Sequence, residues 1–198
     1  MDLAAHVVSA GWASGVNAYL TVAMLSLLGR SGAVEVPDEL TSDPILIGAL
    51  AMFAIEFVAD KVPYVDNMWD VVQTLIRPAI GSWLGFEFAD AAAVGGTDEM
   101  LSGTTGGVTA LASHVVKAGL RLGINTSPEP VSNVIASLTE DGLVAAIVAF
   151  SIEQPELAAV IALILLAAGI ALVVLIWARI RRTLKRLMQR PSARPPPG

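Results

Sequence analysis

The stretch that decides how this chain can fold is Glu56-Phe-Val-Ala-Asp-Lys-Val-Pro-Tyr-Val-Asp-Asn-Met-Trp-Asp-Val-Val-Gln-Thr-Leu-Ile-Arg77. It is rich in charged side chains and lies between long apolar runs. Ionisable groups at membrane depth cost several kcal/mol each, so they usually face a bundle interior, a partner or water. The stretch is therefore expected to form the polar centre of a membrane protein.

The composition places the whole chain in the membrane class. Its 198 residues are 55% hydrophobic with a mean hydropathy of +0.68, and soluble domains usually lie lower. At about 20 residues per span, the length allows roughly six helices with short connections. We predict an all-α, polytopic membrane helical bundle without a separate soluble domain, and expect a homo-oligomer because small bundles often need partners.

The residue types argue against an enzyme. The chain has no cysteine, which excludes disulfides, thiolate metal sites and cysteine nucleophiles. Its two histidines, His6 and His114, lack the spacing of a zinc site, and no G-x-S-x-G or phosphate-binding glycine loop is present. We therefore expect no catalytic residue, no metal and no cofactor.

Apolar runs and turn signals divide the chain into predicted helices. The predicted spans are 3–29, 44–59, 67–88, 102–121, 134–152 and 157–177. The N-terminus lacks the positive segment of a signal peptide, so the first run is interpreted as a retained span. Pro78 should kink the third span. The fourth span is rich in Gly, Ser and Thr, which favours a central or re-entrant helix, and the fifth could be tilted or broken.

Basic residues gather at the C-terminus. Residues 179–194 hold seven of the twelve Lys and Arg, whereas residues 1–178 hold all eighteen acids. The positive-inside rule then places the C-terminus in the cytoplasm, and six spans would place the N-terminus there too. We expect a multi-pass protein of the bacterial cytoplasmic membrane, with a transmembrane domain at 1–178. Residues 179–198 would form a basic helical extension that binds anionic lipid and a disordered Pro-rich tail. Nucleic acid is not expected, because no aromatic platform accompanies the arginines.

Two short internal matches suggest a repeat. Gly11-Trp-Ala-Ser-Gly-Val-Asn-Ala18 and Gly103-Thr-Thr-Gly-Gly-Val-Thr-Ala110 share the pattern G-x-x-x-G-V-x-A, which predicts a 3+3 inverted repeat of the kind found in transporters. A second match, of residues 64–67 with 130–133, requires a different offset, and chance similarity remains an alternative. The Gly11 pattern also favours close helix packing, and Asn17 within it could instead contact a solute.

The charged residues lie on helical faces that can meet. Asp66, Asp70, Gln73 and Arg77 share one face of the third predicted helix. Two further sets, which we expect to meet, are Glu56 with Asp60 at the end of the second helix and His114, Lys117 and Arg121 on one face of the fourth. Buried charges are normally paired, so we expect Arg77 to meet Asp66, Asp70 or Glu140. The candidate residues are Glu56, Asp60, Lys61, Asp66, Asp70, Arg77, His114, Lys117, Arg121, Asn125 and Glu140. They either fix the bundle as ion pairs or line a polar pathway.

Several motifs resemble a known family. They are Ser14-Gly-Val-Asn-Ala-Tyr-Leu20, Phe57-Val-Ala-Asp-Lys-Val-Pro-Tyr-Val-Asp66, Trp69-Asp-Val-Val-Gln-Thr74, Ile76-Arg-Pro78 and Lys117-Ala-Gly-Leu-Arg-Leu-Gly-Ile-Asn-Thr-Ser-Pro-Glu-Pro130. Over roughly residues 5–175 the chain resembles the bacterial membrane proteins called domain of unknown function 4126. The resemblance implies an integral membrane protein and supplies no catalytic residues.

Two functions follow from these observations as hypotheses. The first is a small membrane channel or transporter for an ion or small polar solute, with a charged pathway built from residues 56–77 and 114–133. The alternative is a membrane scaffold or accessory subunit that transports nothing and whose intramembrane charges are structural ion pairs.

Overall fold

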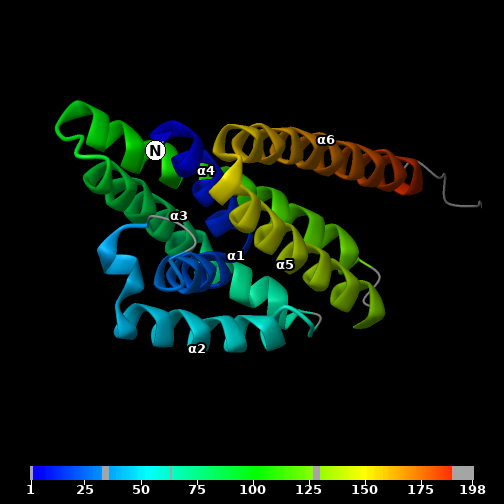
Figure 1. The fold of residues 1–198 in the computed structure, drawn as a ribbon. Helices are drawn as coiled ribbons and strands as arrows, with labels where there is room; N and C mark the ends of the chain where they lie inside the picture. Colours follow the sequence, from blue (N-terminus) through cyan, green and yellow to red (C-terminus); the bar gives the residue numbers. More distant parts are fainter. Residues whose placement is uncertain (1, 33–35, 63, 127–129, 189–198) are drawn as a thin grey trace, which may run out of the picture.

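The chain folds into a bundle of helices (Figure 1). The computed structural model describes residues 2–32, 36–62, 64–126 and 130–188. The elements are α1 (Leu3–Arg30), the short 3-10 helix η1 (Asp38–Thr41), α2 (Asp43–Ala59), α3 (Val65–Ala91), α4 (Thr97–Ile124), α5 (Pro130–Glu153) and α6 (Pro155–Met188). These described residues contain no strand, which confirms the all-α prediction. The expected disordered tail lies outside them.

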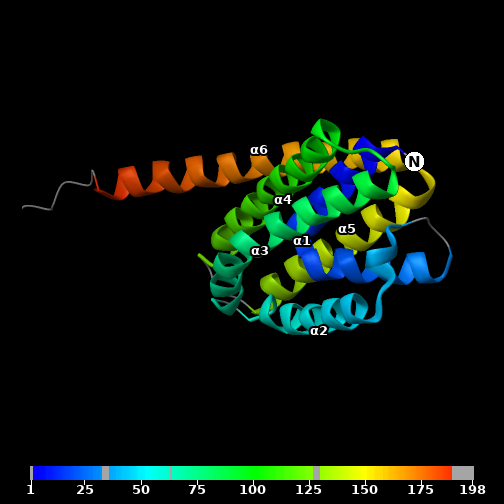
Figure 2. The same cartoon turned by 90° about the vertical axis from the view of Figure 1, so that its left-hand side faces the viewer.

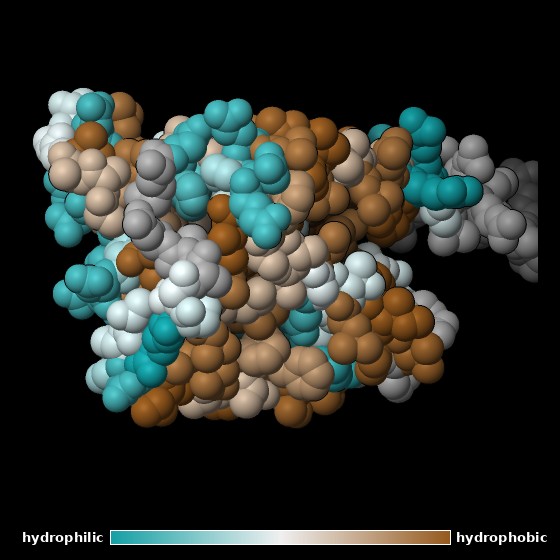
Figure 3. All heavy atoms as spheres, viewed as in Figure 1, coloured by the Kyte–Doolittle hydropathy of each residue, from teal (hydrophilic) through white to brown (hydrophobic). Residues whose placement is uncertain are grey.

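Three helices are long and apolar enough to cross a membrane. They are Leu3–Arg30, Val131–Glu153 and Pro155–Thr183. On the face seen in Figure 3, hydrophobic side chains cover most of α6 before its hydrophilic C-terminal end, as expected for a helix that faces lipid. The chain is therefore a helical membrane protein. Six helices were expected and are present, but length and composition support three of them as spans.

The first helix is broken in its middle. Asn17 has extended backbone angles (φ −149°, ψ 98°) inside α1, and the two halves run in different directions (Figure 2). Near the start of α1, the rings of His6 and Phe88 lie 5.7 Å apart. At its end, Arg30 lines the same cavity as Glu87. Both ends of α1 thus lie beside the C-terminal end of α3, and α1 is a hairpin with its tip at Asn17.

The prediction of one continuous helix at residues 3–29 is therefore wrong, although the segment has the length and composition of a span. Each half of α1 has about 14 residues and is roughly 20 Å long, too short for a hydrocarbon core of about 30 Å. The side chain of Asn17 explains the break, because its Oδ1 accepts a hydrogen bond of 2.9 Å from the N–H of Leu20. Asn17 thereby caps the second half-helix, as Asn does at many helix N-termini. By contrast, α3 stays helical through Pro78.

The start of α1 and the end of α6 lie at opposite ends of the bundle (Figures 1 and 2). The hairpin returns to the end from which it starts, so α1 adds no pass through the bundle. This arrangement favours opposite sides of a membrane for the two ends, and the orientation of the termini stays a prediction. At the far end, α6 continues as a helix past Trp177 to Met188, so no break separates the predicted domain from its basic extension.

Glycines allow α1, α3 and α4 to pack closely. A Cβ on Gly11 would lie 2.8 Å from the carbonyl oxygen of Gly106, and one on Gly81 would lie 2.7 Å from the same atom. This confirms the packing role predicted for the small-residue pattern. The two matched segments differ in structure, since α1 is broken at Asn17 and α4 is continuous. The described residues therefore show no inverted repeat.

Candidate functional site: a buried charge cluster under the hairpin tip

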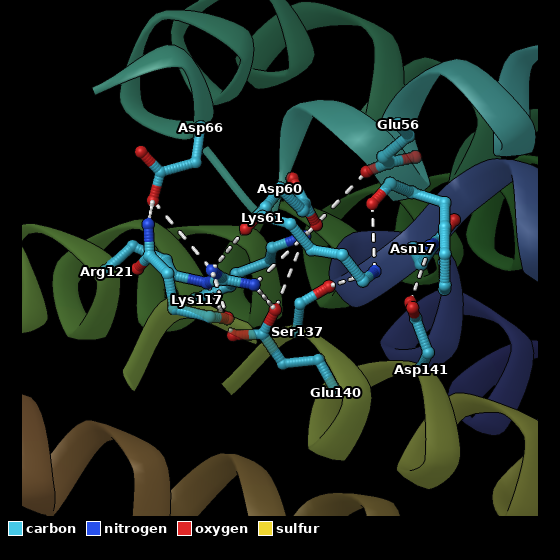
Figure 4. Close-up of polar contacts among 12 residues, drawn as sticks. Asn17, Glu56, Asp60, Lys61, Asp66, Lys117, Arg121, Ser137, Glu140 and Asp141 are labelled. Carbon is cyan, nitrogen blue, oxygen red and sulfur yellow. Dashed lines mark hydrogen bonds and ion pairs between the residues drawn. The ribbon is translucent and has the colours of Figure 1, made fainter. Parts of the chain in front are cut away.

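Charged side chains from four helices meet inside the bundle (Figure 4). We call this set the charge cluster; its members are Glu56, Asp60, Asp66, Asp70, Arg77, Lys117, Arg121 and Glu140. Glu140 has 16% of its side chain exposed, and the others are almost wholly buried. The faces predicted to meet do meet, and buried charges are paired as physical chemistry requires.

Arg77 pairs mainly with α2. Its Nη2 donates to Glu56 Oε1, and its Nη1 lies 3.5 Å from Asp70 Oδ1. The same Nη1 donates to the carbonyl oxygen of Gly15 (3.1 Å) and to Nδ1 of His114 (2.9 Å). Of the expected partners, Asp70 is confirmed, whereas Glu56 was not anticipated.

Lys117 lies at the centre of the cluster. Its Nζ donates to Asp60 Oδ2 (2.6 Å) and to the carbonyl oxygen of Val16 (3.1 Å). Glu140 Oε2 and Glu56 Oε1 lie 3.6 and 3.8 Å away. One ammonium therefore joins α2, α5 and the tip of the hairpin.

Arg121 takes the remaining expected partners of Arg77. It donates two hydrogen bonds to the Glu140 carboxylate, at 3.1 and 2.6 Å, in the two-pronged geometry that guanidinium favours. Its Nη1 donates to the carbonyl oxygen of Asp60 at 2.9 Å and lies 3.8 Å from Asp66 Oδ2. Arg121 thus fixes the ends of α2 and α3 against α5.

Amides satisfy Asp66 at the edge of the cluster. Asn125 Nδ2 lies 3.0 Å from both carboxylate oxygens of Asp66. The backbone N–H of Asn67 donates a hydrogen bond of 2.7 Å to Asp66 Oδ1, and Asn133 Nδ2 donates one of 3.4 Å to Asp66 Oδ2. Asn125 was a predicted site residue, but Asn133 was not. Hydrogen bonds of this kind stabilise the charged carboxylate.

The tip of the hairpin reaches into the cluster. The carbonyls of Gly15 and Val16, at the end of the first half-helix, accept from Arg77 and Lys117, and cations favour the C-terminal ends of helices. Asn17 Nδ2 donates to Asp141 Oδ1 at 2.9 Å. Sequence reasoning missed this role because an Asn within an apolar run is also compatible with an unbroken helix. The usable signal was that Asn is a strong N-cap residue.

His114 is neutral and belongs to the packing around Arg77. Arginine only donates hydrogen bonds, so His114 Nδ1 must accept the bond from Arg77 Nη1. Its proton therefore lies on Nε2, which is 3.0 Å from Thr74 Oγ1. The histidine orients Arg77 and is not available as a cation partner.

Lys61 lies at the margin. Its ammonium sits 3.0 Å from the centre of the Phe57 ring and donates to Ser137 Oγ at 3.2 Å. Partial burial lowers the pKa of Lys61 from its usual value. Among the predicted candidates, Lys61 follows the end of α2 and makes a cation–π contact with that helix rather than an ion pair within the cluster.

One cavity reaches the charge cluster, and a larger one lies at another part of the bundle. The first, of about 120 Å³, lies between α1, α4, α5 and α6; it reaches Lys117 and Glu140, and its other walls are mainly apolar. The second, of about 1060 Å³, opens at the end of the bundle that carries the N-terminus. Its lining includes the acids Asp38, Glu39, Glu87 and Asp90. The hairpin and α3 lie between this acidic opening and the charge cluster.

The match to known families covers most of the chain. A family model described as a domain of unknown function (DUF4126) matches residues 4–175. The chain belongs to the DUF4126 family. No curated protein and no solved structure matched it. The family match agrees with the extent expected from the motifs, contains the whole charge cluster, and assigns no activity to it.

Proposed function

We propose that this DUF4126 protein is a small membrane channel or transporter for an ion or small polar solute. The observation that carries the proposal is the hairpin of α1, whose tip carbonyls at Gly15 and Val16 contact buried cations. Broken helices with their ends at a polar site are how transporters bind ions and solutes inside a membrane. Irregular backbone at that depth occurs where it is buried in protein or lines a cavity.

The arrangement suggests a gated route. The acidic opening at the N-terminal end would gather cations, since clefts lined by one sign of charge concentrate counter-ions. The hairpin then separates this opening from the charge cluster, which continues to Asp66 and Asn125 near the opposite end of the bundle. Movement of the hairpin tip would join the two regions. The Lys117 and Arg77 contacts to the tip are the bonds that such movement must break.

A structural role is the second candidate, and one observation favours it. Each of Arg77, Lys117 and Arg121 has at least two carboxylate partners within 4 Å. Such pairs can fix the arrangement of helices, as a scaffold or accessory subunit would need. The scaffold function requires the charges only for folding.

Flux through liposomes separates the two candidates. Purified protein is reconstituted, and ion and proton movement is recorded across a panel of salts. Transport predicts a selective flux that Asp60→Asn, or Asp60→Asn with Asp70→Asn, removes while the folded protein is still recovered. An absence of flux under every gradient supports the scaffold.

We further propose how the protein sits in its membrane. The basic end of α6 lies in the cytoplasm of a bacterium, where it binds anionic lipid, and the N-terminus lies outside. The exposed apolar face of α3, which includes Met68, Val71 and Leu75, contacts lipid or a second copy of the chain.

A further inference from the structure

We propose that Asp70 is a buried proton-binding site that exchanges its proton with water. Asp70 is 4% exposed and lies on α3, beside Arg77. This inference rests on the proposed function in one respect, because it names the proton as the coupling ion. The presence of the proton itself is tested independently of transport.

Asp70 differs from the other carboxylates of the cluster in its hydrogen bonds. Glu56, Asp60, Asp66 and Glu140 each accept at least one hydrogen bond from a side chain. Neither carboxylate oxygen of Asp70 has a hydrogen-bond partner. A buried carboxylate without a donor is costly in its charged form, so Asp70 is the position where a proton is most favourable.

The nearest cation cannot supply the missing bond. Arg77 Nη1 lies 3.5 Å from Asp70 Oδ1, but it carries only two hydrogens. Both are used, one by the carbonyl oxygen of Gly15 and the other by His114 Nδ1. The contact with Asp70 is therefore electrostatic, without a shared hydrogen.

The surrounding charges leave a negative excess. The cluster contains five carboxylates and three cations. Charged groups reach Asp70 from every helix that builds the cluster. They are Arg77 on α3, Lys117 on α4, Asp60 at the end of α2 and Glu140 on α5. The α4 residue His114 is neutral. The hydroxyl oxygen of Tyr19 on α1 accepts a hydrogen bond from Gln73 Nε2. Addition of one proton to Asp70 reduces the excess negative charge of the cluster, and no further cation is needed.

A proton fits this place better than a metal ion. No three His, Cys, Asp or Glu side chains in the part of the chain that is described are placed to hold a metal. Protonation needs no coordination shell: one O–H bond forms on Asp70, and the proton comes from water and returns to it. The new O–H is a donor, and Gln73 Oε1, three residues along the same helix, is a buried acceptor without a partner.

Infrared spectroscopy of the purified full chain tests the site directly. We expect a carbonyl band of a protonated carboxylic acid at mildly acidic pH, which disappears on titration to high pH. Asp70→Asn should remove this band, whereas Asp66→Asn, at a carboxylate with amide donors, should keep it. The proposal would be overturned if the unmodified protein lacked the band or if the band survived in Asp70→Asn. It would also be overturned if addition of Na⁺ at constant pH removed the band.

A second variant covers the case in which Asp70→Asn does not fold. Asp70→Glu keeps a carboxylic acid, so its band should no longer shift when aspartate is isotopically labelled; a shift that persists assigns the proton elsewhere. A band at Asp70 without any flux would contradict transport and leave the proton site intact. Flux that ignores a pH gradient, with no band, would contradict the proton site alone.

Discussion

The ammonium nitrogen of Lys117 lies 3.1 Å from the carbonyl oxygen of Val16. This contact joins the tip of a broken helix to a cation that also binds Asp60 at 2.6 Å. The carbonyl is available because Asn17, the next residue, leaves the helical conformation. The break in α1 and the charge cluster are therefore parts of one structure, and disturbance of either should affect the other.

Removal of the Lys117 charge should destabilise the fold strongly. Lys117→Met leaves Asp60 with a weaker partner and the Val16 carbonyl without its donor. Loss of one member of a buried pair typically costs about 3–5 kcal/mol. The measurement is unfolding of the purified protein in detergent. Lys185→Met is the control, because Lys185 is exposed on α6, and its stability should not change. Equal stability of the two variants would contradict the burial of Lys117 as an ion-pair partner within the charge cluster.

Gly15 should not accept a side chain. A Cβ there would overlap Ser113 Oγ and the carbonyl oxygen of Ala110, so Gly15→Ala must push α1 away from α4. Overpacking costs typically about 1–3 kcal/mol, seen as a lower melting temperature. Gly142→Ala in α5 meets nothing within 4 Å and should be neutral or stabilising by up to about 1 kcal/mol. A lower melting temperature for Gly142→Ala than for Gly15→Ala would show that α1 and α4 do not pack closely at Gly15.

Arg121 and Glu140 should show strong energetic coupling. Arg121→Met removes both of their hydrogen bonds, at 3.1 and 2.6 Å, and Glu140→Gln removes the negative charge and one of the two acceptor oxygens. A double-mutant cycle with Arg121→Met and Glu140→Gln should give an interaction energy of about 1–3 kcal/mol. The same cycle on the exposed pair Arg30–Asp43 should give less than about 1 kcal/mol. Similar values for both cycles would argue against a buried pair.

The hairpin predicts the topology of the chain in a membrane. The sequence has no cysteine, so single cysteines can be placed freely and labelled with an impermeant maleimide. Asp2→Cys and Asp38→Cys should react from the same side, and Lys185→Cys from the other side. Labelling of Asp2→Cys and Lys185→Cys from one side would restore the continuous first span and rule out the hairpin.

Composition and helical periodicity were sufficient to predict the helices and the residues that meet. The four-residue and three-residue spacings in 66–77 and 114–121 put the right side chains on one face, because burial of charge forces those faces together. The pairing within the cluster was only partly predictable. Arg77 binds Glu56 rather than Asp66 or Glu140, since the offset between α2 and α3 is set by tertiary packing.

The hairpin could not be predicted from hydropathy. Residues 3–29 have the length and apolar character of a single span, and hydropathy does not register a change of direction. The decisive residue was Asn17, whose side chain replaces the helical partner of Leu20. The hairpin also bears on the predicted orientation, because one helix that returns to its starting end would place the N-terminus on the other side.

The decisive measurement is the flux of protons and salts through liposomes that contain the unmodified protein. A pathway through the charge cluster predicts a selective flux that is lost in Asp60→Asn and in Asp70→Asn, and retained in Lys185→Met, with all variants folded. An absence of flux in the unmodified protein under every gradient, or flux that persists in both aspartate variants, would contradict a pathway through the charge cluster.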